Sequence, residues 1–80
     1  MLLDRLGNRV ERGSFLVSCE DPVALVVVTR VAAVGRCYEV YGTVLEWASY
    51  GEAVGESGLW DRIVGSTLFN QEVIREGVIR

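Results

Sequence analysis

The chemistry open to this 80-residue chain is limited first by two absences, since it contains neither histidine nor lysine. Those residues supply the most common general base, the usual amine nucleophile and the most common metal ligand. Acid–base catalysis would fall to carboxylate pairs such as Glu20 with Asp21 or Glu52 with Glu56. Both pairs lie in sequence typical of solvated turns. We therefore expect no enzymatic activity.

The two cysteines, Cys19 and Cys37, do not point to a reactive or metal-binding site. Two thiols without histidine cannot complete a zinc site, and neither cysteine has an evident neighbour that would lower its pKa. A disulfide needs Cα atoms within about 7 Å, and the strands expected below place these residues at opposite ends of a sheet. We expect two reduced thiols and no metal or cofactor.

The glycine and charge patterns also argue against a phosphate-binding loop and against a nucleic-acid-binding surface. The segment GEAVGESG at 51–58 is glycine-rich but lacks the Gly-Lys-Ser/Thr ending of a phosphate loop, and its glutamates would repel phosphate. The net charge is −3, and only Arg5, Arg9 and Arg12 are close in sequence, with acidic residues among them. Nucleic-acid affinity depends on clustered cations. We therefore expect a flexible loop at 51–58 and no nucleic-acid binding.

The segment VALVVVTRVAAV at 23–34 is apolar at almost every position but carries Arg30 inside it. Its β-branched residues predict a strand, and a strand with one face in solvent would alternate apolar with polar residues. This one does not, so we expect both faces to be covered, one by the core and the other by a second subunit. A buried Arg30 requires a partner: Glu39, a carboxylate of a neighbouring copy, or a bound anion.

The elements that must position these residues are mostly strands, expected at 14–20, 23–33 and 37–48, with Gly42 marking a bend in the third. Ser57 as N-cap and Gly65 as C′ residue predict a short helical turn near 58–64. Residues 66–80 fit either a helix to Glu76 or short strands about a Glu76-Gly77 turn, and their β-branched content favours strands. The chain forms one domain, 1–80. We expect a small barrel or a strongly curved antiparallel meander.

The hairpin around Gly35 can be aligned in two ways. A two-residue loop of Val34 and Gly35 places Arg30 opposite Glu39, which gives an ion pair across the ladder. A three-residue loop with Gly35 in the left-handed conformation places Arg30 opposite Tyr38 instead. The sequence leaves both alignments open.

The candidate sites follow from Arg30 and the aromatic residues of the third strand. Alternation places Tyr41 and Trp47 on one face with Glu39, where they would either pack in the core or offer a stacking or self-associating surface. The candidate ligand-binding residues are Arg30, Arg36, Glu39, Tyr41 and Trp47. The candidate interface residues are Val26, Val28, Arg30, Tyr41 and Trp47.

The opening stretch, Asp4-Arg-Leu-Gly7-Asn-Arg-Val10-Glu-Arg-Gly13-Ser14-Phe-Leu-Val17, resembles the start of many small SH3-like β-barrel proteins common in tailed phages. That pattern runs Asp, two residues, Gly, two residues, Val or Ile, two residues, Gly-Asp and then an apolar strand. A later Gly-x-Val is matched here by Gly42-Thr-Val44. The chain departs from the pattern at Ser14. The resemblance implies a fold and a phage origin, and it implies no function.

Taken together, the sequence predicts a non-enzymatic binding protein that acts as a homo-oligomer, an accessory or inhibitor protein of phage type working through protein–protein interaction. The alternative is a protein that sequesters a small anionic ligand, such as a nucleotide, at a subunit interface. The start of the chain lacks a signal-peptide pattern. The longest apolar run is too short for a bilayer and is interrupted by Arg30. We therefore expect a cytoplasmic protein with no membrane contact, in the host cytoplasm if phage-encoded.

Overall fold

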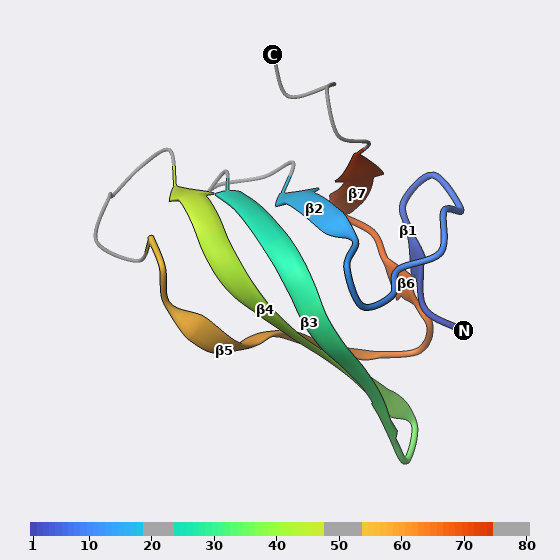
Figure 1. The fold of residues 1–80 in the computed structure, drawn as a ribbon. Coiled ribbons are helices and arrows are strands. Elements are labelled where there is room, and N and C mark those ends of the chain that lie inside the picture. The colour runs from blue at the N-terminus through green and yellow to red at the C-terminus, as the bar shows by residue number, and fades with distance from the viewer. Residues whose placement is uncertain (19–23, 48–53, 75–80) are drawn as a thin grey trace.

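The computed structural model describes residues 1–18, 24–47 and 54–74, and within these ranges the ordered elements are all strands (Figure 1). The strands are β1 Leu3–Asp4, β2 Phe15–Ser18, β3 Ala24–Val34, β4 Cys37–Trp47, β5 Ser57–Val64, β6 Thr67–Leu68 and β7 Gln71–Ile74. Five of them form an antiparallel sheet in the order β5-β4-β3-β2-β7, and β1 pairs with β6 in parallel. The mostly β fold expected from the sequence is confirmed.

The five-stranded sheet is strongly curved but is not closed into a barrel, because its two edge strands, β5 and β7, do not pair with each other. Side chains connect these edges instead. The Trp60 indole N–H donates to Gln71 Oε1 at 2.8 Å, and Gln71 Nε2 donates to Asp61 Oδ2 at 2.8 Å. Gln71 is buried, so its amide lies in the interior between the two edges. The structure is thus the curved meander of the two predicted alternatives, with β7 added beside β2.

The curvature arises at three irregularities of the ladder. The β3–β4 register shifts between Leu25 and Val26 and again between Val28 and Arg30, and the β4–β5 register shifts between Val40 and Tyr41. Such bulges increase strand twist and bend the sheet.

Gly42 lies beside two of these shifts, where β4 passes very close to β3. A Cβ atom at Gly42 would lie 2.5 Å from Val26 Cγ1 and 2.7 Å from the Val27 carbonyl oxygen. Only a residue without a side chain fits there. The bend expected near Gly42 is confirmed, and close backbone approach is its physical cause.

The core lies on the concave face of the sheet, beneath the N-terminal segment and β6 (Figure 1). The sheet and the segments that cover it contribute similar numbers of side chains to this core. The fully buried cluster consists of Leu2, Val10, Leu16, Val28, Val40 and Leu68. Val31, Tyr38, Trp60, Ile63 and Val73 pack against its rim.

Strand β3 explains the long apolar run, because its two halves have different surroundings. Ala24, Leu25 and Val26 are consecutive and all buried, so both faces of the first half are covered within one chain. Beyond the register shift at Val28 the strand packs less closely on the core, and Val31 is only partly buried against it. Thr29 and Arg30 are both exposed, and so is Val34 at the far end. Within one chain, both faces of β3 are therefore covered only in its first half, whereas we expected cover on both faces along the whole strand.

The helical turn expected near 58–64 is wrong, since these residues form the edge strand β5. The spacing of the apolar residues in GLWDRIV suits either structure. Pairing with β4 from Cys37 to Thr43 gives the segment ladder hydrogen bonds, whereas an isolated helix of two turns is only marginally stable. Gly65, with φ of 95°, turns the chain into β6 rather than ending a helix.

Of the remaining predictions, the structure confirms the strands after Ser66 and contradicts the hairpin alignments. Strands at 67–68 and 71–74 confirm the preference for strands after Ser66, while the Glu76-Gly77 turn lies outside the described residues. Both predicted hairpin alignments are wrong. The loop is Gly35-Arg36, so Val34 pairs with Cys37, and the same register continues unbroken to Arg30 opposite Tyr41. Gly35 has φ of 61°, as the first central residue of a type II′ turn requires.

The N-terminal turn shows what the Asp-x-x-Gly spacing does. The buried Asp4 carboxylate accepts the backbone N–H groups of Leu6, Asn8 and Val73 at 2.7–2.9 Å and the Asn8 side-chain amide at 3.0 Å. Burial alone would raise the pKa of Asp4, but these four donors outweigh it, with Val73 N–H the strongest, and the pKa is lowered. Gly7, with φ of 85°, closes the turn. Asp4 thus joins the N-terminal turn to β7.

Candidate functional site

Arg30 is placed on the convex, outer face of the sheet by the bulge in β3. Its guanidinium carbon lies 4.1 Å from the centroid of the Tyr41 ring, which is the distance of a cation–π contact. The predicted ion pair with Glu39 is absent, because that carboxylate pairs with Arg62 at 3.8 Å and accepts the Tyr41 hydroxyl at 3.0 Å. Arg30 therefore stacks on an aromatic ring and forms no ion pair within the described part of the chain.

The five candidate ligand residues are only partly brought together. Arg30, Tyr41 and Glu39 form one contact group. Arg36 lies in the hairpin loop, where its carbonyl accepts the Gly65 N–H at 3.1 Å. Trp47 is the last residue of β4, six positions and about 20 Å along the strand from Tyr41, and its side chain is outside the described part of the structure.

The candidate interface residues are also divided. Val26 and Val28 are 0% and 1% exposed and face the concave side, so they offer a partner no surface. Tyr41 and Arg30 lie on the outer face. Apolar residues exposed on that face include Val34 on β3 and Leu59 and Val64 on β5. Sequence reasoning did not select Leu59 and Val64 because β5 was taken for a helical turn.

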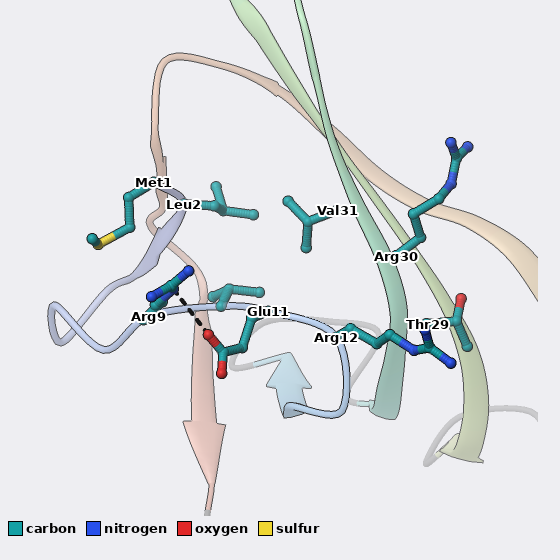
Figure 2. A pocket seen from close by; sticks show the side chains of 9 residues that line it. Met1, Leu2, Arg9, Glu11, Arg12, Thr29, Arg30 and Val31 are labelled. Atoms are coloured by element: carbon teal, nitrogen blue, oxygen red, sulfur yellow. Dashed lines mark ion pairs between the residues drawn. The ribbon is translucent and has the colours of Figure 1, made fainter.

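A pocket of about 460 Å³ opens between the N-terminal segment and β3 at its bulge (Figure 2). Its lining combines apolar side chains with charged ones. The lining residues are Met1, Leu2, Arg9, Val10, Glu11, Arg12, Thr29, Arg30 and Val31. Of these, the sequence analysis selected Arg30 alone.

The charges around this pocket are predominantly positive. Arg9 pairs with Glu11 at 2.9 Å on one side of the pocket (Figure 2). Arg12 lies on the other side with its guanidinium beside Thr29, and the Arg30 side chain extends away from the pocket (Figure 2). Neither arginine forms an ion pair with a described residue. A signal for this arrangement was present in the sequence as the cluster of Arg5, Arg9 and Arg12, but its proximity to Arg30 depends on the fold.

The described residues include no group of three or more acidic, cysteine or histidine side chains placed to hold a metal ion. Cys37 is half-buried, and Cys19 lies outside the described ranges, as do Glu20, Asp21 and Glu52. Within the described ranges we also find no helix that is long and apolar enough to span a membrane.

No protein-family model, curated protein or solved structure matches the chain. A functional assignment therefore rests on the outer face and the pocket just described.

Proposed function

We propose that this protein is a non-enzymatic binding protein that acts as a homo-oligomer through the outer face of β4 and β5. The observation that carries this proposal is the exposure of aliphatic side chains there: Leu59 is 54% exposed, Val64 79% and Val34 48%. In the ladder, Val34 and Val64 flank Cys37 in one row, and Leu59 lies beside Tyr41 in another. Several large apolar side chains exposed on one face in this way are typical of protein interfaces.

The edge of the sheet supports a second copy of this chain as the occupant. Strand β5 is an edge of eight residues, and its outer side is unpaired within the described chain. Exposed edges of this length readily pair with another strand. Two copies of one edge strand can pair antiparallel about a two-fold axis. Such pairing places the outer-face side chains of the two β5 strands, Leu59 and Val64 among them, side by side across the new ladder.

The charges of the outer face are compatible with the same partner. The pair Glu39 and Arg62 lies between the row of Cys37 and the row of Tyr41, and Arg30 is in the same row as Tyr41. A face that carries both signs of charge can be complementary to its own copy, whereas a face of one sign would repel it. An 80-residue chain also lies in the size range where one core is only marginally sufficient.

The experiment that tests this proposal is native mass spectrometry combined with light scattering after size-exclusion chromatography. We expect the wild-type mass to be an integer multiple of the chain mass. Leu59→Asp and Val64→Asp place a charge on the face and should raise the subunit dissociation constant about a hundredfold or more. Phe69→Asp is the matched control, since Phe69 is 82% exposed between β6 and β7.

Circular dichroism confirms that each variant keeps its β structure. A wild-type protein that is monomeric at tens of micromolar contradicts the proposal. So does an oligomer that both face variants leave intact, or one that Phe69→Asp dissociates as readily as Leu59→Asp does.

The alternative expected from the sequence, an anionic ligand held by all five candidate residues, has weaker support. Arg36 and Trp47 lie at opposite ends of β4 from each other. A ligand small enough to touch Arg30 and Tyr41 cannot also span both ends of an 11-residue strand.

A further inference from the structure

The second half of β3 has an open edge. Strand β2 pairs with β3 only over Leu25–Val27, and Gly13 and Ser14 extend this contact as far as Val28. Beyond Val28, β3 pairs with β4 alone among the described strands. The β3–β4 hairpin therefore projects past β2 with nothing paired to that side of residues 30–34 (Figure 1).

The backbone groups on this edge follow from the hairpin register. In a hairpin with a two-residue loop, the residues that flank the loop, Val34 and Cys37, exchange hydrogen bonds. Alternation along the ladder then directs the N–H and C=O groups of Val31 and Ala33 away from β4. Neither residue makes a backbone hydrogen bond to a described residue on that side. Two donors and two acceptors therefore point outward along one line.

This edge lacks the features that usually protect an exposed strand from pairing. Protected edges carry lysine, proline or a bulge, whereas residues 31–34 read Val-Ala-Ala-Val. The nearest charge on the strand is Arg30, and its guanidinium lies over the Tyr41 ring on β4, at 4.1 Å from the centroid. Ala33 and Val34 are exposed. An approaching strand meets neither a charge nor a proline on these four residues.

The pocket of about 460 Å³ lies alongside the start of this edge, because Thr29, Arg30 and Val31 form its wall on the β3 side. The Val31 side chain turns toward Leu2 across the pocket (Figure 2). Leu2 and Val10 are 2% and 3% exposed and belong to the core. A strand added to β3 would therefore place every second side chain against an apolar surface.

The end of the groove nearest the bulge is positively charged. Arg12 lies there beside Thr29 and forms no ion pair with a described residue (Figure 2). Glu11 is the one carboxylate among the lining residues, and it pairs with Arg9. A strand that runs antiparallel to β3 has its carboxyl end at this point. The charge there favours an acidic residue in that part of the strand.

We propose that the open edge of β3 binds an extended segment of a partner protein by strand addition. The segment runs antiparallel to β3 and hydrogen-bonds to the backbone of Val31 and Ala33. Its alternate side chains are apolar and pack against Leu2 and Val10, and an acidic residue near its carboxyl end meets Arg12. This site is separate from the outer face of β4 and β5, so the inference goes beyond the proposed homo-oligomer.

The experiment is a titration of ¹⁵N-labelled protein followed by NMR, with the peptide acetyl-Thr-Val-Thr-Val-Thr-Asp-amide as the probe. In the proposed alignment its two valines lie opposite Ala33 and Val31, and its aspartate reaches Arg12. We expect saturable shifts at the amides of residues 9–12 and 29–34. The dissociation constant should be on the order of 1 mM, which the net contribution of four backbone hydrogen bonds supports.

Two N-methylated peptides of identical composition test strand addition directly. In an antiparallel pair, the valine N–H groups opposite Val31 and Ala33 point to β3, and the threonine N–H groups point away. Methylation of both valine nitrogens removes two hydrogen bonds and should weaken binding at least about tenfold. Methylation of the first two threonine nitrogens is the matched control and should change the affinity by less than about threefold.

Two protein variants test the edge and the charge. Ala33→Pro removes an outward N–H and places a ring on the edge, so it should weaken binding at least about tenfold. Arg12→Gln should weaken binding about threefold, the scale of an exposed ion pair, and should leave unchanged the affinity for a peptide with asparagine in place of the aspartate. Arg36→Gln is the matched control, because Arg36 is exposed and does not line the pocket. Circular dichroism verifies that each variant is folded.

The inference is overturned if the peptide gives no saturable shifts up to about 20 mM, roughly twentyfold above millimolar affinity. Equal weakening by valine and threonine methylation also overturns it, because binding would then not depend on hydrogen bonds to β3. An oligomer that Ala33→Pro dissociates would show that a second copy occupies this edge instead. The titration is repeated on the Leu59→Asp variant, where we expect the same affinity, so the failure of either proposal is recognised without the other.

Discussion

Replacement of Asp4 by Asn is the sharpest test of how this fold is held together. In the wild type, Asp4 Oδ1 accepts the N–H groups of Leu6 and Asn8, and Oδ2 accepts those of Val73 and the Asn8 side chain. An amide keeps one acceptor oxygen but turns an NH₂ group toward the other two donors. Two charge-assisted hydrogen bonds are lost at a site that is 1% exposed.

The expected cost follows from those bonds. Each hydrogen bond to a charged group contributes about 1.5–3 kcal/mol, so the loss of two should lower the free energy of unfolding of Asp4→Asn by about 3–6 kcal/mol. A chain of this length has roughly 4–12 kcal/mol in total. With a denaturant dependence of about 1 kcal/mol per molar urea, the urea midpoint should fall by about 3 M or more. Trp fluorescence and circular dichroism both report the transition.

The dependence on pH supplies a second readout. The pKa of Asp4 is lowered in the folded state from its ordinary value of 3.8. Its stabilisation is therefore complete above that ordinary value and is lost as the pH falls through the lower, folded-state pKa. The difference in stability between wild type and Asp4→Asn should be constant near pH 7 and shrink in strong acid.

Glu11→Gln is the control, because Glu11 is an exposed carboxylate in a surface ion pair and such pairs contribute about 0–1 kcal/mol. A urea midpoint for Asp4→Asn no lower than that of Glu11→Gln would refute the reasoning. A stability difference from wild type that is as large at pH 2 as at pH 7 would refute it too.

Three further substitutions test other contacts. Gly42→Ala should cost about 1–3 kcal/mol by overpacking against β3, and the added change Val26→Ala should recover part of the lost urea midpoint; an unchanged midpoint in Gly42→Ala would contradict the close approach. Gln71→Ala should cost about 1–3 kcal/mol by removing a buried side chain that accepts from the half-buried Trp60 indole and donates to Asp61, and should speed hydrogen exchange in β5 and β7 more than in β3. Tyr41→Leu should cost about 0.5–1 kcal/mol and broaden the range of Arg30 side-chain conformations seen by NMR; an Arg30 signal unchanged from wild type would argue against the cation–π contact.

The sequence predicted the class of fold because β-branched content and turn residues are local signals. The strand at Ala24–Val34 and the bend at Gly42 were both read correctly from such signals. The segment at 57–64 was misread because its apolar spacing suits both a helix and a strand, and only the edge offered by β4 decides between them. That edge is a tertiary feature, which local pattern cannot supply.

The site was harder to predict for a related reason. The position of Arg30 depends on a one-residue bulge, which reverses the faces of all residues beyond it. The bulge between Val28 and Arg30 puts Arg30 on the opposite face from Val26 and Val28, whereas simple alternation would put all three on one face. The pocket combines residues 9–12 with residues 29–31, and such long-range proximity is not encoded in the spacing of either segment.

The contact between Asp4 and the backbone of Val73, 69 residues apart, has a consequence for how the protein is made. The N-terminal turn cannot reach its final partner until β7 has been synthesised and has left the ribosome. Strands β1 and β6 are likewise paired across the length of the chain. Contacts between such distant segments slow folding because a long loop must close first. We expect the β2–β4 meander to form early, and the N-terminal segment, which completes both the core and the arginine-lined pocket, to dock last.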